Sequence, residues 1–168
     1  MTLIDSSNDA EQLTLTVVAE FDADAERVWQ VWEDPRKLER WWGPPTYPAT
    51  FTRHEFFVGG ESRYFMTGPN GETPRGWWRI DAIDRPRSLA FANGLAGDDG
   101  EPAPGVAPAA GHVSFDALGE RTRMTVLTRF VDAAQMQKML DMGMQEGMAQ
   151  AIGQIDGVLA LASSASSR

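Results

Sequence analysis

The chain has 168 residues, of which 42% are hydrophobic and 23% are charged, the proportions of a single soluble domain. It contains no cysteine and only two histidines, His54 and His112, which excludes thiol nucleophiles, disulfides, thiolate zinc sites and a three-histidine metal site. The net charge of −9, with arginines scattered among acidic residues, argues against nucleic acid as a partner.

The sequence shows no segment that would direct the chain into a membrane. No run of about 18 or more apolar residues is present, so we expect no transmembrane span and no membrane partner. Residues 1–10 are polar and lack the apolar core of a signal peptide, and we predict that they form a flexible N-terminus. We therefore expect a cytoplasmic protein.

The first elements are predicted to be a strand followed by two helices. Apolar residues alternate with polar ones over Leu13–Phe21, a pattern typical of a half-buried strand. After Asp22 or Asp24, either of which can cap a helix, apolar residues as far as Trp32 recur at helical spacing. A proline ends this helix, and Pro35–Trp41 is predicted to form a second, short helical segment.

Most of the chain between Tyr47 and Val131 is predicted to form strands. The turn sequences Gly59-Gly60 and Pro69–Gly71 are typical of hairpins, so we expect consecutive strands to pair in an antiparallel meander. The six predicted strands are Pro48–Val58, Glu61–Thr67, Arg75–Ile83, Ser88–Asn93, Gly111–Ala117 and Thr122–Phe130.

The connection between two of these strands is long. In the segment 93–111, eight of nineteen residues are glycine or proline. Loops of this length inside a compact domain are often functional. The segment is therefore a candidate lid, with a tolerated surface insertion as the alternative.

The last element is predicted to be a long helix. Asp132-x-x-Gln135 is a variant of the capping box, and apolar residues follow at helical spacing from Met136 to Ala162. Four glycines interrupt this stripe, so the helix either packs closely against another element or bends near Gly143–Gly147.

The order of these elements predicts an α+β fold. We expect one domain at residues 11–162, followed by a flexible tail at residues 163–168. A meander that ends in an amphipathic helix can bury its apolar face by curving around that helix. In this predicted fold, two short helices lie between the first strand and the meander.

Short motifs in a fixed order resemble one protein superfamily. They are DADAERVW at Asp22–Trp29, WWGP at Trp41–Pro44, the pair Gly59-Gly60, RPRSL at Arg85–Leu89 and MGMQEGM at Met142–Met148. In their order and spacing, the chain resembles the START-like, or SRPBCC, superfamily over about residues 12–161. The match is to the subfamily related to the C-terminal domain of activators of the Hsp90 ATPase. This resemblance implies the helix-grip fold, a curved seven-stranded antiparallel sheet around a long C-terminal helix, with a cavity between them.

The resemblance does not supply a function, because members of the superfamily include ligand-binding proteins, aromatase/cyclases and co-chaperone domains. The chain also departs from its relatives at three positions. Met148 stands where many relatives have tryptophan, which implies a flexible side chain facing the cavity. Glu55 and Phe57 stand where relatives often have aspartate and arginine, so the acid–base pair of those relatives is not expected here.

Methionines and aromatic residues supply the candidate binding site. Five of the eight methionines lie between Met136 and Met148, where they either pack a core or form a deformable apolar cavity wall. On the strand 75–83, Trp78 is predicted to face inward and Trp77 to face solvent. The predicted ligand-binding residues are Trp41 at the cavity mouth, Tyr64 with its hydroxyl, Met66, Trp78, Phe115, Met124, Val126, Met144 and Met148.

The polar residues suggest no catalytic machinery. The chain contains no nucleophile elbow, Walker loop, dinucleotide-binding fingerprint or zinc-protease motif. His54 is predicted to share a strand face with Thr50 and Thr52, and His112 opens a strand beside the long loop. We predict no catalytic residue, no metal site and no cofactor.

The favoured hypothesis is therefore the binding of a small hydrophobic or aromatic molecule between the sheet and the last helix. One alternative is a co-chaperone-like interaction module, whose partner would be a chaperone. Another is a cyclase/aromatase-like enzyme acting on a polyketide-like substrate, with Tyr64 or His54 as its acid–base group. A homodimer is a further candidate assembly.

Overall fold

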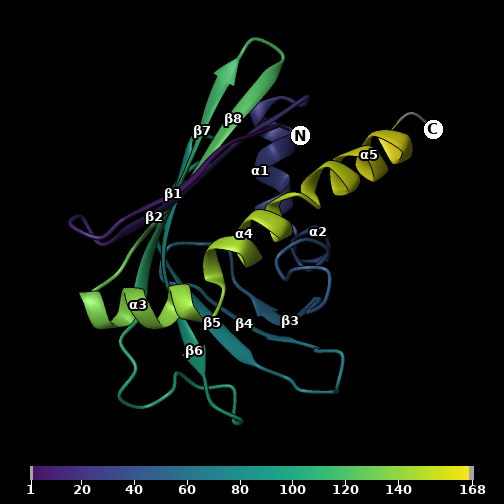
Figure 1. Cartoon of the computed structure of the whole chain (residues 1–168). Helices are drawn as coiled ribbons and strands as arrows, with labels where there is room; N and C mark the ends of the chain where they lie inside the picture. Colours follow the sequence, from purple (N-terminus) through teal and green to yellow (C-terminus); the bar gives the residue numbers. More distant parts are fainter. Residues whose placement is uncertain (1, 167–168) are drawn as a thin grey trace.

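The strands of the protein form one antiparallel sheet. In a computed structural model, residues 2–166, the part of the chain that the structure describes, form eight strands and five helices (Figure 1). The strands are β1 (Thr2–Asp9), β2 (Thr14–Phe21), β3 (Ala49–His54), β4 (Glu61–Met66), β5 (Arg75–Asp84), β6 (Ser88–Ala96), β7 (Ala109–Leu118) and β8 (Arg121–Arg129). The helices are α1 (Ala25–Glu33), α2 (Pro35–Leu38), α3 (Ala133–Asp141), α4 (Met144–Ile152) and α5 (Ile155–Ser166).

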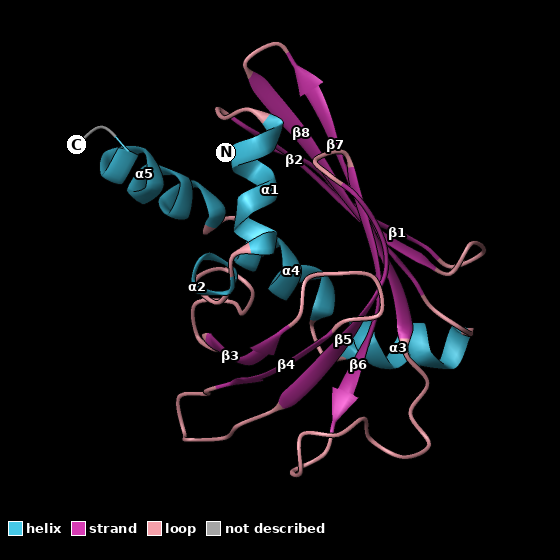
Figure 2. Ribbon diagram, turned by 180° about the vertical axis from the view of Figure 1, so that it is seen from behind, coloured by secondary structure: helices cyan, strands magenta, loops and turns pink. Residues whose placement is uncertain are grey.

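The sheet has the strand order β1-β2-β8-β7-β6-β5-β4-β3, so β3 to β8 form the predicted meander. The chain returns at the end of the meander to place β8 beside β2. Figures 1 and 2 show the sheet curving, with α1, α4 and α5 on its concave side. The predicted α+β, helix-grip architecture is confirmed.

The prediction of a flexible N-terminus is wrong for Thr2–Asp9, and the sheet has eight strands where seven were expected. This segment is β1, an edge strand that pairs with β2 along its length. Its sequence lacks apolar alternation, and Ile4 is 48% exposed. Backbone hydrogen bonds hold it, together with the Gln145 amide, which bonds to the side chains of Ser6 and Asn8.

Aspartate side chains fix where the first two helices begin. The Asp24 carboxylate accepts a hydrogen bond from the Arg27 backbone N–H at 2.9 Å, so Asp24 rather than Asp22 caps α1. The Asp34 carboxylate does the same for α2 by accepting from the Arg36 N–H. Trp29 and Trp32 lie on the face of α1 that packs into the core, where both are buried as predicted.

The predicted long C-terminal helix is broken into three segments. Gly143 adopts φ +84° between α3 and α4, a conformation that suits glycine, and a second break separates α4 from α5. The predicted bend near Gly143 is thus a full interruption of the helix. Helix α5 continues to Ser166 through part of the predicted tail, while residues 167 and 168 lie outside the described residues. No helix in the described part of the chain is long and apolar enough to cross a membrane.

Buried apolar side chains form two clusters on the concave side. The larger one joins α1 and α5 to the sheet and contains Trp29, Trp32 and Trp78. The smaller one lies under α3 and contains Leu15, Phe130 and Met136 together with nearby methionines. The candidate site lies where these two clusters meet.

Trp77 does not face solvent as predicted, because it is only 7% exposed. It lies on the opposite face of the sheet from Trp78, in register with Gly94 on β6. A Cβ atom on that glycine would come within 2.9 Å of the Trp77 indole nitrogen. The missing side chain therefore leaves room for the ring to pack against the sheet.

Candidate functional site

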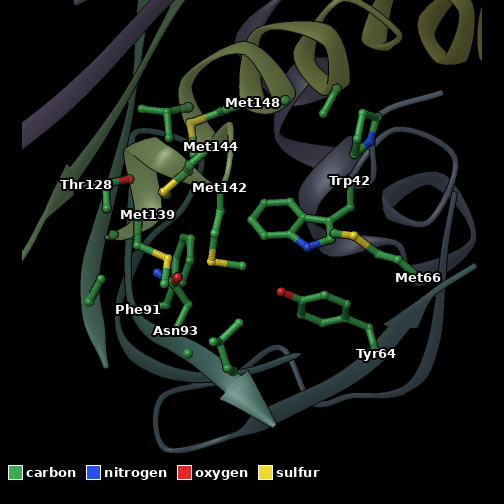
Figure 3. Close-up of a pocket in the computed structure, with 18 of the residues that line it drawn as sticks. Trp42, Tyr64, Met66, Phe91, Asn93, Thr128, Met139, Met142, Met144 and Met148 are labelled. Carbon is green, nitrogen blue, oxygen red and sulfur yellow. The ribbon is translucent and has the colours of Figure 1, made fainter. Parts of the chain in front are cut away.

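A cavity of about 310 Å³ lies between the sheet and the C-terminal helices. It draws side chains from both apolar clusters, and Figure 3 shows Trp42, Tyr64 and Met66 on one side, with Phe91 and four methionines of the C-terminal segment across from them or above. Prominent side chains lining it are Trp32, Trp41, Trp42, Tyr64, Met66, Phe91, Asn93, Val126, Thr128, Met139, Met142, Met144 and Met148. Among the described residues, no lining side chain carries a charge.

Tyr64 on β4 reaches the cavity by crossing its neighbouring strand. Its register partner on β5 is Gly76, and a Cβ atom there would lie 2.3 Å from the tyrosine ring and hydroxyl. Only the absence of a side chain at Gly76 lets the ring lie flat across the strand. The Tyr64 hydroxyl then points into the cavity beneath Trp42 (Figure 3). Burial among apolar side chains raises the pKa of Tyr64, and the nearby Trp42 N–H lowers it by less.

Tryptophans from the helix α1 region form a second wall. Trp32 packs edge-on against Trp41 and Trp42, with ring centroids 4.8 and 6.0 Å away. The Trp41 N–H donates to the carbonyl of Val31 at 2.8 Å, and the Trp32 N–H donates to the Met124 sulfur at 3.4 Å. The Trp42 N–H is buried and has no hydrogen-bond partner among the described residues.

Methionines form the opposite wall and the mouth of the cavity. Met139 comes from α3, Met142 lies at the α3–α4 junction, and Met144 and Met148 come from α4. Met142 is 62% exposed although it lines the cavity, so it marks the opening to solvent. The break at Gly143 is what turns Met142 and Met144 toward the cavity from the ends of two different helices.

The long loop between β6 and β7 reaches this mouth. Val106 and Ala107 line the cavity. The Gln135 amide on α3 donates to the Ala107 carbonyl at 2.6 Å, and Glu101 pairs with Arg63 on β4 at 3.3 Å. The loop is therefore tied to α3 at the mouth and to the outer face of β4, where Arg63 is in register with Trp77.

Six of the nine predicted binding residues line the cavity: Trp41, Tyr64, Met66, Val126, Met144 and Met148. Trp41 is only 1% exposed, so it lies in the interior and not at the mouth as predicted. The other three residues, Trp78, Phe115 and Met124, are not among the lining residues and are buried in the larger cluster.

Those three residues are covered because aromatic side chains fill that part of the concave face. Phe115 packs edge-on against Trp29, with ring centroids 5.4 Å apart. Trp78 stacks on Phe91 at 4.6 Å, and Met124 receives the Trp32 N–H. Trp78 and Met124 thus contact residues that line the cavity without lining it themselves.

Sequence reasoning missed several lining residues. Trp42 was not among the predicted residues, although it lines the cavity beside Trp41. Asn93 is the register partner of Trp78, which was predicted to face inward, so the strand register would have identified it. Met139 and Met142 belong to the methionine-rich segment, but the break at Gly143 decides their direction.

His54 lies outside the cavity, and its environment corrects the strand face that was predicted for it. A β-bulge between Phe51 and Arg53 shifts the alternation, so His54 turns to the concave side while Thr50 and Thr52 are exposed. The buried Ser62 hydroxyl donates to His54 Nδ1 at 2.7 Å, and His54 Nε2–H donates to the Trp32 carbonyl at 2.9 Å. Both ring nitrogens are thus used: Nδ1 bonds to β4, and Nε2 holds β3 against α1.

We expect this histidine to make stability depend on pH. Burial lowers the pKa of His54 below its ordinary value of 6.5, although the carbonyl of Trp32 and the charges of Glu33 and Asp34 partly oppose this effect. The unfolded chain therefore binds a proton at higher pH than the folded chain, so the free energy of unfolding falls as pH drops below 6.5. Urea unfolding at about pH 7.5 and about pH 5.5 measures the loss. We expect a smaller loss in His54→Gln and an unchanged one in the exposed His112→Gln; equal losses in all three proteins would contradict this origin.

A family model described as "Activator of Hsp90 ATPase homolog 1-like protein" matches residues 22–160, most of the chain. The chain belongs to this family. Within the START-like superfamily it is thus a member of the activator-like subfamily, as its motifs predicted. A search of curated proteins found no match.

Several solved structures are similar to this chain. A protein from Arthrobacter aurescens is 52% identical, with a TM-score of 0.90 over 95% of this chain and 92% of that chain. A protein from Mycobacterium smegmatis is 41% identical, with a TM-score of 0.87 over 96% of this chain and 99% of that one. DynU16, a protein from the dynemicin biosynthetic locus, shares the fold at 15% identity, with a TM-score of 0.60 over 88% of this chain and 47% of that chain.

None of the acidic, basic or histidine side chains in the described part of the chain lines the cavity. In the part of the chain that the structure describes, no group of three or more His, Cys, Asp or Glu residues could hold a metal ion. A second, polar hollow lies at the other end of the sheet, beside Asp24, Arg27 and Arg121. The site with a shaped apolar interior is the methionine- and tryptophan-lined cavity.

Proposed function

We propose that the protein binds a small hydrophobic or aromatic molecule in the cavity between the sheet and the C-terminal helices. The observation that carries the proposal is the apolar, uncharged lining of a cavity of about 310 Å³, close to the lower size of typical small-molecule sites. Burial of the ligand's apolar surface would supply the affinity, at about 25 cal/mol per Å². A few polar side chains would orient the ligand.

The two walls support this proposal in different ways. The tryptophan and tyrosine rings are held by packing and by hydrogen bonds such as that of Trp41 to Val31, so they present a fixed shape. The methionines opposite them are unbranched and adjust to a ligand's outline. An aromatic molecule would find flat partners on one side and adaptable ones on the other.

We further propose that the β6–β7 loop is the lid. Its residues Val106 and Ala107 contribute to the lining, and Val106 is 36% exposed at the mouth. The contacts of Ala107 with Gln135 and of Glu101 with Arg63 are hydrogen bonds near the surface, which can break and reform as a ligand enters.

Uptake of 1-aminoanthracene, an uncharged fluorophore of three fused rings, tests the function. Met148→Arg would place an unpaired charge in the apolar wall, which is costly to desolvate, so we expect the affinity to fall at least about tenfold. Gln150→Arg adds the same charge to an exposed position of α4 and should leave uptake unchanged. Absence of any uptake by the unmodified protein would overturn the proposal.

The two alternative functions predict other outcomes. For a co-chaperone-like module, which the family description suggests, a purified chaperone would bind the protein and Met148→Arg would not affect that binding. For a cyclase-like enzyme, a bound ketide would be converted and Tyr64→Phe would stop the conversion while the ligand still bound. His54 is not available for that role because it does not line the cavity.

A further inference from the structure

The Tyr64 hydroxyl points into the cavity, and the Trp42 N–H lies beside it. We infer that the ligand is an uncharged molecule carrying a carbonyl-type oxygen, which accepts a hydrogen bond from the Tyr64 hydroxyl, with the Trp42 N–H orienting that hydroxyl. This inference rests on the proposed function and adds the chemical class of the ligand to it.

Trp42 acts on this hydroxyl from beside it. An indole N–H can only donate a hydrogen bond. The N–H groups of Trp32 and Trp41, on the same wall, both donate to acceptors elsewhere in the protein. The buried Trp42 N–H lies next to the Tyr64 hydroxyl in Figure 3 and lowers the pKa of Tyr64, so it favours the orientation in which the tyrosine oxygen faces the indole and the hydroxyl proton faces the cavity.

Tyr64 supplies the donor. Its hydroxyl points into the cavity from the strand side, a position that the bare backbone of Gly76 makes possible. The raised pKa of Tyr64 keeps the phenol protonated at neutral pH, so the hydroxyl remains able to donate. A hydroxyl donor in an uncharged, apolar lining favours a neutral acceptor oxygen, as in a ketone or quinone.

The charge of the lining excludes acidic ligands from this class. No arginine, lysine or histidine is among the described residues that line the cavity, so an ionised carboxylate would lose its hydration without gaining a counter-charge. An ionised amine would face the same cost because the lining holds no carboxylate either. A neutral oxygen needs only the hydroxyl donor that Tyr64 presents.

Three probes with one ring system test the inference by competition with 1-aminoanthracene. Fluorenone carries a carbonyl oxygen at the position where fluorene has a methylene group and fluorene-9-carboxylate has an ionised acid. We expect fluorenone to bind about 2- to 10-fold more tightly than fluorene, the effect of one neutral hydrogen bond. We expect the carboxylate to bind more weakly than fluorene.

Variants that remove one donor and keep a ring identify the residues responsible. Tyr64→Phe and Trp42→Phe should each reduce the ratio of fluorenone to fluorene affinity. Tyr47→Phe is the matched control, because it removes the chain's other tyrosine hydroxyl, which bonds to Glu72 and does not line the cavity. The ratio, rather than the affinity, is the readout, because the smaller ring of Trp42→Phe weakens both probes alike.

Each outcome decides the matter. Equal affinity for fluorenone and fluorene, tightest binding of the carboxylate, or a fluorenone preference that survives in both variants would overturn the inference while leaving the proposed function in place. Failure of the unmodified protein to bind fluorene and 1-aminoanthracene would overturn the proposed function itself.

Discussion

Trp32→Ala is expected to lower the free energy of unfolding by about 3–5 kcal/mol, the range for removing a fully buried large aromatic side chain. Trp32 is 1% exposed and packs against the rings of Trp41, Trp42 and Trp78. Its N–H also donates to the Met124 sulfur on β8, so the ring joins α1 to the far side of the sheet. Urea unfolding followed by circular dichroism measures the change.

Trp32→Phe separates packing from the loss of this hydrogen bond. Phenylalanine keeps a ring in the cluster, so we expect a smaller loss of about 1–2 kcal/mol. If the alanine variant were destabilised by no more than the phenylalanine variant, packing of the Trp32 ring would contribute nothing to the free energy of unfolding. That result would contradict the role that its ring contacts assign to it.

Gly76→Val is expected to abolish most ligand uptake while the sheet remains folded. A Cβ atom at this position would collide with the ring and hydroxyl of Tyr64 at 2.3 Å. The ring can escape by moving into the adjacent cavity, which then has less room for a ligand. We expect the affinity for 1-aminoanthracene to fall by up to about 100-fold, the scale of an overpacking penalty of up to 3 kcal/mol.

The double variant Gly76→Val with Tyr64→Ala tests this explanation. Removing the tyrosine ring removes the collision, so uptake should return to the level of Tyr64→Ala alone. Persistent loss of uptake in the double variant, with an unchanged circular dichroism spectrum, would show that Gly76 affects binding by some route other than the position of Tyr64.

Most of the sheet could be predicted from the sequence because its concave face is apolar and its turns are marked by glycine and proline. The alternation at Leu13–Phe21 yields β2 to within one residue, and the aspartate before the first helix is its cap. Strand β1 could not be found in this way, since backbone hydrogen bonds to β2 hold it and leave no apolar pattern. Local irregularities caused the other errors: the bulge before Arg53 turned His54 inward.

The sequence predicted which types of residue line the candidate site, but not which individual residues reach the cavity. The concentration of methionine indicated an adaptable wall, and six of the nine selected residues line the cavity. Whether an inward side chain lines a cavity or is covered by another side chain depends on distant packing, as for Phe115, which lies behind Trp29. The contribution of Met142 likewise depends on the left-handed backbone at Gly143, since a continuous helix would direct it elsewhere.

The attachment of α4 to the rest of the protein bears on how binding preferences can change within this fold. Ladders of backbone hydrogen bonds join the strands, whereas α4 meets β1 through side chains, as in the contacts of Gln145 with Ser6 and Asn8. Substitutions at Met144 or Met148 are therefore expected to change the shape of the cavity without disturbing any strand pairing. Under the proposed function, we therefore expect the choice of ligand to depend on the methionines of α4 more than on the pairing of the strands.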